Sequence, residues 1–219
     1  MKHLLIVACA VLLATMQAGA ATMRDFLISE PGVVFPTLPQ AARAGLVTYA
    51  EQGQASTLST TNRFGNSSSI DTLTADYAVV KVSQSCTISL KMLTRGTRDT
   101  VIAVIETVAT PTRDSRIAFY DTQWKPLPTR KYFKQLPAMR DFFKPATPKD
   151  TLAQLLTAVD FPMIEMQWTG PGFNTLTATQ GLKTFYSKED YQKWAPYVVD
   201  SIDYYIDGGT AIKRKTSKR

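Results

Sequence analysis

The chain has 219 residues, of which 44% are hydrophobic, and its formal net charge at pH 7 is +7. This length and composition suffice for one large hydrophobic core or two small ones. The sequence contains one histidine, His3, and two cysteines, Cys9 and Cys86. Because His3 and Cys9 lie in a predicted leader, the mature chain excludes Ser-His-Asp catalysis, histidine-containing zinc sites and an intramolecular disulfide.

Residues 1–20 have the three parts of a signal peptide in the expected order. Lys2 gives the charged start, an apolar run follows over Leu4–Ala14, and small residues precede a cleavage site that we place after Ala20. The apolar run is shorter than the roughly 20 residues that span a bilayer. We therefore expect a protein without a membrane span that is exported to the periplasm or the extracellular space.

The first half of the mature chain predicts two helices followed by strands. Thr22 can cap a short helix that ends before Pro31, and a second helix starts near Pro39. Apolar and polar residues alternate over 84–93, as in a half-buried antiparallel strand that places Cys86 on its apolar face. Further strands are expected over 57–64, 75–82, 101–108 and 116–120.

Residues 124–144 form a basic connector with several prolines, which discourage regular structure. Six basic residues against the single acid Asp141 give this segment a charge of +5. Two interpretations stay open: a surface that binds an anionic polymer, or a connector whose aromatic residues enter the core while its basic residues stay solvated. The candidate binding residues are Trp124, Lys125, Arg130, Lys131, Tyr132 and Lys134.

After the connector the pattern of helix and strands starts again. We expect a helix over 150–158, strands over 161–168 and 175–186, a short helix that ends at Trp194, and a strand over 198–206. Five of the last seven residues are basic, which predicts a disordered basic tail over 213–219.

These elements predict an α+β fold in which antiparallel sheet meanders pack against a few helices. We expect one domain over residues 21–212. The tetrapeptide 23–26 recurs at 139–142, and a faint duplication would divide the domain into halves 21–123 and 145–212, joined by the connector 124–144.

The residues that remain for catalysis are carboxylates. Glu106 lies in an apolar strand and Glu165 in a later strand, and a hydrolase that uses paired carboxylates is the alternative to a binding protein. We expect no cofactor, because phosphate-binding glycine motifs are lacking, and no metal, because the spacing of Asp200, Asp203 and Asp207 does not fit a calcium loop. Export makes nucleic acid an unexpected ligand, and self-association through a sheet edge is a third alternative.

The middle of the chain contains the segments Ile70–Tyr77, Val80–Ser85 and Ile88–Leu93, followed by Phe119–Asp121 and Trp124–Pro128. In these segments the chain resembles a secreted family of Bacteroides-type bacteria that is described as a domain of unknown function. The resemblance implies export into the envelope of a Gram-negative bacterium, and it assigns no site residues.

We therefore expect an exported envelope protein that binds a protein or a glycan without catalysis. Such bacteria attach glycans at Asp-Ser/Thr-aliphatic triplets. Thr100, in the triplet Asp99–Val101 at the end of a predicted hairpin, is the best candidate for O-glycosylation.

Overall fold

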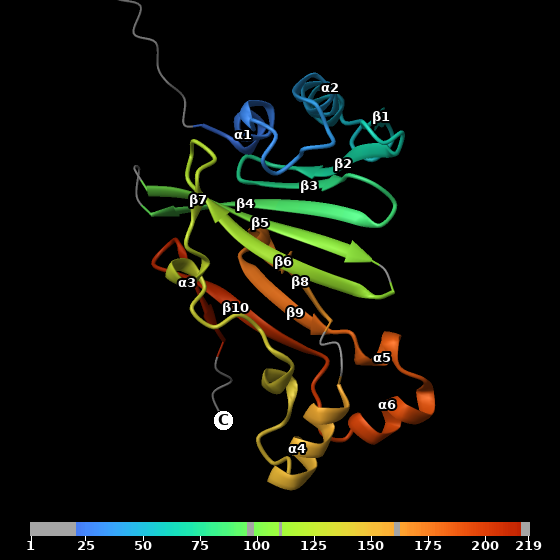
Figure 1. Ribbon diagram of the computed structural model, residues 1–219. Helices are drawn as coiled ribbons and strands as arrows, with labels where there is room; N and C mark the ends of the chain where they lie inside the picture. The colour runs from blue at the N-terminus through green and yellow to red at the C-terminus, as the bar shows by residue number, and fades with distance from the viewer. Residues whose placement is uncertain (1–20, 96–98, 110, 160–162, 216–219) are drawn as a thin grey trace, which may run out of the picture.

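A computed structural model describes residues 21–95, 99–109, 111–159 and 163–215 (Figure 1). The predicted leader 1–20 and the last residues of the predicted tail, 216–219, lie outside this range.

Within the described residues the chain forms two antiparallel sheets and six α-helices, which confirms the predicted α+β class. The larger sheet is a meander of seven strands in chain order: β1 (Thr60–Thr61), β2 (Ser67–Leu73), β3 (Tyr77–Lys81), β4 (Cys86–Arg95), β5 (Asp99–Ala109), β6 (Arg113–Tyr120) and β7 (Pro126–Leu127). The smaller sheet has the order β11-β10-β9-β8, with β8 (Ile164–Thr169), β9 (Thr175–Gln180), β10 (Ser201–Asp207) and β11 (Ala211–Arg214). The helices are α1 (Met23–Ser29), α2 (Gln40–Glu51), α3 (Thr129–Tyr132), α4 (Lys149–Ala158), α5 (Leu182–Phe185) and α6 (Lys188–Trp194), with 3₁₀ turns η1 (Met139–Phe142) and η2 (Pro171–Phe173).

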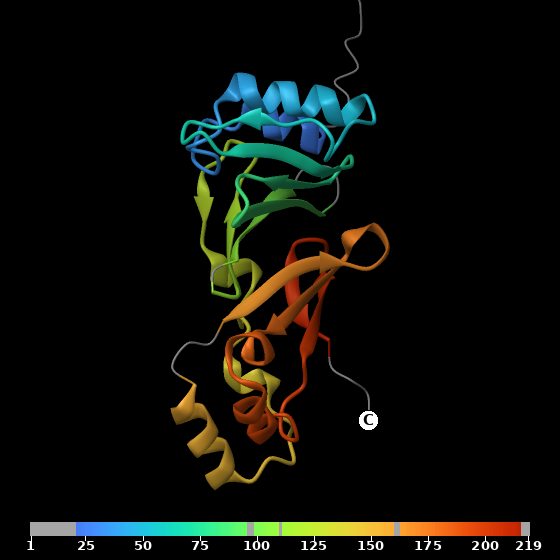
Figure 2. The same ribbon diagram turned by 90° about the vertical axis from the view of Figure 1, so that its right-hand side faces the viewer.

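The seven-stranded sheet is covered on both faces (Figures 1 and 2). Helices α1 and α2 pack on one face, where Leu90 and Val104 belong to the same core as Phe26 and Leu46. The four-stranded sheet packs on the other face, where the core includes Leu93, Ala103, Ile105, Trp168 and Leu176. Residues 101–105 of β5 are therefore all buried, which explains why this strand is apolar without alternation.

The alternation in β4 predicts a solvent-facing side that includes Lys91, and this expectation is wrong. Lys91 is 1% exposed, because the hairpin between β8 and β9 covers this part of the sheet. Its Nζ donates to Asp76 Oδ2 at 2.6 Å and to the Gly172 carbonyl at 2.7 Å, while Phe173 stacks on Tyr77 with 4.0 Å between the ring centroids. The alternation identified a strand correctly, but both of its faces contribute to a core.

Several element boundaries also differ from the predictions. The strand expected over 57–64 is only Thr60–Thr61, and the strand expected over 175–186 ends at Gln180, whose Oε1 accepts the Leu182 N–H at the start of α5. The predicted disordered tail begins too early: Lys213 and Arg214 lie in β11 and pair with Tyr205 and Tyr204 of β10.

One edge of the smaller sheet is capped by side chains of the larger sheet. The outward N–H groups of Ile164 and Met166 in β8 donate to Asp114 Oδ1 at 3.1 Å and to Ser115 Oγ at 2.9 Å, both on β6. Backbone groups that a neighbouring chain could otherwise pair with are thereby used within the molecule.

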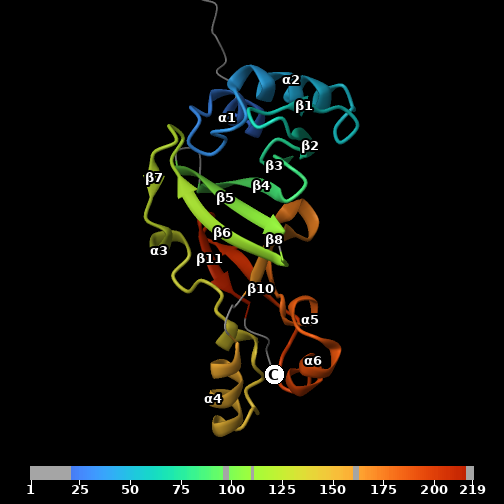
Figure 3. The same cartoon turned by 45° about the vertical axis from the view of Figure 1, so that its right-hand side comes forward.

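The connector 124–144, which we call the strap, includes the edge strand β7 and passes around this edge of the seven-stranded sheet, next to β6 (Figures 1 and 3). Trp124, in a left-handed backbone conformation, packs edge-on against Phe26 of α1 with 6.4 Å between the ring centroids. Tyr132, Phe133 and the aromatic residues that follow belong instead to the core beneath the opposite face. The strap therefore joins all three layers.

A buried charge pair connects α1 to α2. Arg43, on α2, donates from Nε to the Leu27 carbonyl at 2.8 Å, from Nη1 to the Leu38 carbonyl at 2.5 Å, and from Nη2 to the Glu30 carbonyl. Its Nη1 also lies 3.4 Å from Glu30 Oε2, and the side chains of Arg43 and Glu30 are 3% and 0% exposed. This guanidinium fixes the chain between the two helices.

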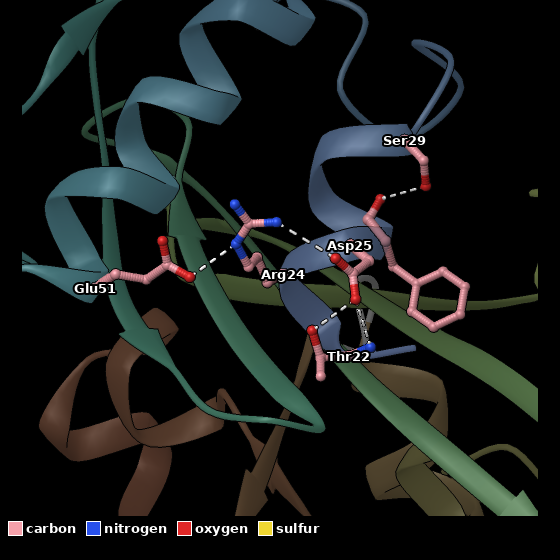
Figure 4. A network of polar contacts seen from close by, with 6 residues as sticks. Thr22, Arg24, Asp25, Ser29 and Glu51 are labelled. Carbon is pink, nitrogen blue, oxygen red and sulfur yellow. Dashed lines mark hydrogen bonds and ion pairs between the residues drawn. The ribbon is translucent and has the colours of Figure 1, made fainter. Parts of the chain in front are cut away.

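The same two helices share a second ion pair at the surface (Figure 4). Arg24 Nε lies 2.8 Å from Glu51 Oε1, and both side chains are about half exposed. Thr22 is the N-cap residue directly before α1, as predicted, and Asp25 Oδ2 accepts hydrogen bonds from its backbone N–H and its hydroxyl. Arg24 therefore forms an exposed ion pair in the same pair of helices that the buried side chain of Arg43 connects.

We predict that Arg43→Ala lowers the free energy of unfolding by about 3 to 5 kcal/mol, because the buried Glu30 side chain then has no cation to pair with. Arg24→Ala is the matched control and should cost no more than about 1 kcal/mol, because its ion pair is solvated. Urea denaturation followed by circular dichroism measures both values. Equal losses for the two variants would contradict the structural role of Arg43.

The turn between β10 and β11 approaches the end of β4 closely. Gly208 and Gly209 both have positive φ angles, 57° and 86°. A Cβ atom on Gly209 would collide with the carbonyl oxygen of Thr94, whereas one on Gly208 would meet nothing within 4 Å.

We predict that Gly208→Ala costs about 1 to 2 kcal/mol for its left-handed backbone, and that Gly209→Ala costs about 1 to 3 kcal/mol more because of the added collision. Thermal unfolding of the two variants under identical conditions separates the two contributions. If both variants melt at the same temperature, the turn does not pack against Thr94 as described.

Candidate functional site

The structure places the aromatic and basic residues of the strap on opposite sides. Trp124 and Tyr132 are 4% and 8% exposed, whereas Lys125, Arg130 and Lys134 are exposed to solvent. Lys131 is also exposed, with Nζ 5.4 Å from the centroid of the Tyr132 ring. The accessible part of the predicted binding surface is therefore basic rather than aromatic.

The strap lies beside β11, which brings two basic segments of the sequence together. Phe133 forms a β-bridge with Ile212, and Arg214 Nη2 donates to the Asp141 carbonyl at 2.8 Å. We use the name basic surface for the exposed basic residues of both segments. These residues are Lys125, Arg130, Lys131, Lys134, Arg140, Lys144, Lys213, Arg214 and Lys215.

Few of these cations have an acidic partner. Arg214 Nη1 lies 3.3 Å from Asp141 Oδ1, and Lys213 Nζ lies 2.5 Å from Asp207 Oδ2. In the described part of the chain, the other cations of the basic surface are not within ion-pair distance of an Asp or Glu side chain. The single acid of the strap is thus already bound by β11.

A second candidate site is a hollow of about 140 Å³ over β5 and β6, on the face of the sheet that carries α1 and α2. In Figure 3 these helices lie over the first strands of the sheet, and β5 and β6 extend beyond them. The segment before α2 supplies Val33, Val34 and Pro36, and the sheet supplies the other lining residues. We call this site the β5–β6 hollow, and its sheet residues are Ile88, Val104, Glu106, Arg116, Ala118 and Tyr120.

Three polar side chains, Glu106, Arg116 and Tyr120, line this hollow. Arg116 Nη2 lies 2.7 Å from Glu106 Oε2, across the antiparallel pair of β5 and β6. Burial raises the pKa of Tyr120, and the carboxylates of Glu30 and Glu106 raise it further, while Arg116 acts in the opposite direction. The Tyr120 hydroxyl is therefore protonated at neutral pH and can donate a hydrogen bond.

The hollow was not predicted from the sequence, although Glu106 was noted as an acid in an apolar strand. The predicted strands 101–108 and 116–120 already contained Glu106, Arg116 and Tyr120. What the pattern could not supply was the register that places Glu106 opposite Arg116, or the distant segment around Val34 that closes the hollow.

The two carboxylates considered for hydrolysis are not brought into one site. Glu106 lines the β5–β6 hollow, whereas Glu165 lines a different hollow and lies 2.8 Å from Arg113. Paired-carboxylate hydrolysis requires two acids that face each other about 5 to 10 Å apart. Each of these acids instead pairs with its own arginine.

The remaining candidates have structural partners. Asp200, Asp203 and Asp207 contact Tyr191, Thr177 and Lys213 respectively, and no group of three or more metal-ligating side chains occurs among the described residues. Cys86 is half-buried, and burial, followed by the nearby Glu106 carboxylate, raises the pKa of its thiol. This shift disfavours the reactive thiolate.

Thr100 lies within β5, opposite Thr94, and its side chain is half-buried. It is therefore part of a paired strand rather than of an open loop. None of the helices in the described ranges is long and apolar enough to cross a membrane.

Comparison with solved structures supports the fold. A domain of an uncharacterized protein from Porphyromonas gingivalis W83 superimposes with a TM-score of 0.76 and 23% sequence identity, covering 88% of this chain and 98% of that one. No curated protein matches the sequence. A family model described as "Protein of unknown function (DUF3256)" matches residues 15–210. The predicted relationship to a domain of unknown function is thereby confirmed, and the chain belongs to the DUF3256 family.

Proposed function

We propose that this protein is an exported, non-enzymatic binding protein of the Gram-negative envelope, and that its basic surface binds an acidic glycan. The observation that carries this proposal is the separation of charge from aromatic residues in the strap. The aromatic side chains hold the strap on the core, so the basic side chains are left in solvent with few acidic partners.

The charges are distributed along the strap rather than gathered in one pocket. The strap begins next to β7, continues through α3 and η1 beside β11, and ends near α4 (Figure 1). A single exposed ion pair contributes little, but a ligand with repeated negative charges can contact several cations at once. This distribution favours a polyanionic chain over a single anion.

The rival hydrolase receives less support, because Glu106 and Glu165 each pair with an arginine in separate hollows. A protein partner with an acidic surface would use the same cations. The glycan is preferred because the cations are spread along the length of the strap, so that a linear polymer can contact several of them in succession.

We predict that replacing Lys125, Arg130 and Lys134 together by Gln weakens binding to alginate, a linear polyuronate, by about 10- to 100-fold. The control replaces Arg63, Lys183 and Lys188 by Gln and thus removes the same charge from other exposed positions. Surface plasmon resonance on immobilised alginate, with neutral dextran as the blank, measures both variants. Equal weakening would indicate attraction by net charge alone and would contradict a role for the strap.

Binding to alginate should also weaken steeply with salt. Exposed charges are screened over about 8 Å at physiological ionic strength and over about 3 Å at 1 M. Affinity measured in 0.05 to 0.5 M NaCl, again by surface plasmon resonance, should fall progressively for the natural protein and more shallowly for the strap variant. Salt-independent binding would exclude an electrostatic surface.

The proposed export makes a separate prediction. In a Gram-negative host the mature protein should begin at Ala21 and be recovered from the periplasm or the medium. Leu12→Arg, which interrupts the apolar run, should leave the uncleaved precursor inside the cell. Mass spectrometry of the N-terminal peptide in each fraction provides the measurement, and a cytoplasmic protein that retains residues 1–20 would overturn the assignment.

A further inference from the structure

The β5–β6 hollow has one wall that is held in place by buried charge. Glu30 Oε1 accepts the backbone N–H of Gly32 at 2.9 Å and that of Val34 at 2.7 Å, and Arg43 holds Glu30 from the other side. A buried ion pair is seldom a more stable choice than well-packed apolar residues. Its effect here is to keep Val33 and Val34 in one position over the sheet, which is how a preorganised binding wall is built.

The opposite end of the hollow presents both signs of charge side by side. A single hydrogen bond joins Arg116 Nη2 to Glu106 Oε2. Among the described residues, the other carboxylate oxygen of Glu106 and the other nitrogens of Arg116 make no hydrogen bond to protein atoms. The side chain of Arg116 is 81% exposed, so it is accessible to a ligand.

Between the wall held by Glu30 and the end that carries Arg116 and Glu106, the hollow is lined by aliphatic side chains. Val34, Ile88, Val104 and Ala118 line the hollow, and Val33 at its rim is 54% exposed. The hollow measures about 140 Å³. An apolar cavity of about 150 Å³ holds one benzene molecule, so the space suits a single aliphatic side chain and is too small for a polymer.

We propose that the β5–β6 hollow binds a small zwitterion, an α-amino acid with an aliphatic side chain of about the size of leucine. The ligand carboxylate pairs with Arg116, the ligand ammonium pairs with Glu106, and the side chain occupies the space beside Val34. Tyr120 lies four residues further along β6 and provides one further hydrogen-bond donor in the lining of the hollow. This site is separate from the basic surface and does not depend on glycan binding.

The ion pair also indicates why both ligand charges are needed. A monocarboxylate at Arg116 would bring a second negative charge next to Glu106, and like charges so close are unfavourable. An amine alone would meet the same difficulty at Arg116. A zwitterion complements both groups without leaving either one uncompensated.

Isothermal titration calorimetry of the full mature chain tests the proposal with four ligands. L-leucine should give saturable binding. Leucinamide lacks the carboxylate, 4-methylpentanoate lacks the ammonium and glycine lacks the side chain, so each should bind at least 10-fold more weakly. Arg116→Gln should weaken leucine binding at least 10-fold. Arg113→Gln, which removes another exposed arginine of β6, should leave it unchanged.

Three results would overturn the proposal. The first is no saturation by leucine below about 10 mM, a range that includes even weak, millimolar binding. The second is equal binding of glycine, which would place the ligand outside the aliphatic hollow. The third is equal binding of 4-methylpentanoate, which would identify a simple carboxylate site. Circular dichroism checks that the variants fold, and Val33→Asp at the exposed rim should reduce leucine binding independently.

Discussion

The whole molecule depends on one constraint: the seven-stranded sheet is apolar on both faces. In β5, Ile102 and Val104 point to the helical layer, while Ala103 and Ile105 point to the smaller sheet. Since each square ångström of apolar surface removed from water contributes about 25 cal/mol, the apolar parts of both faces favour cover by other layers. The covering layers are far apart in the sequence, so a segment must pass from one to the other. The strap does this, beginning at Trp124 in one core and continuing to Phe133 in the other.

Both candidate sites arise from the way in which these layers are held together. The strap uses its aromatic residues for packing, and its basic residues are exposed as a result. The β5–β6 hollow exists because α1 and α2 do not extend over the whole face of the sheet. The segment between these helices forms one wall of the hollow and is held in position by Glu30 and Arg43. Polar networks of this kind carry strict geometric requirements, whereas the aliphatic core tolerates exchange among residues of similar volume.

The sequence was sufficient for the local elements and for the fold class. Thr22 lies at the N-cap position directly before α1, as predicted, and the alternation over 84–93 identified β4. The sequence was insufficient wherever the burial or pairing of a residue depends on another layer of the fold that packs against it. Lys91 reads as a solvated position but is buried by a hairpin 81 residues further along the chain. The pairing of Glu106 with Arg116 and the incorporation of Lys213 into β11 likewise depend on register and on neighbours that residue patterns do not encode.

The position of β11 has a consequence for the order in which the molecule can fold. Strands β2 to β6 each pair with the next strand in the chain, so this meander consists of local contacts that form rapidly. By contrast, Ile212 meets Phe133 and the Gly209 turn meets Thr94, contacts that join segments far apart in the sequence. The second core therefore depends on contacts that form more slowly than those of the meander.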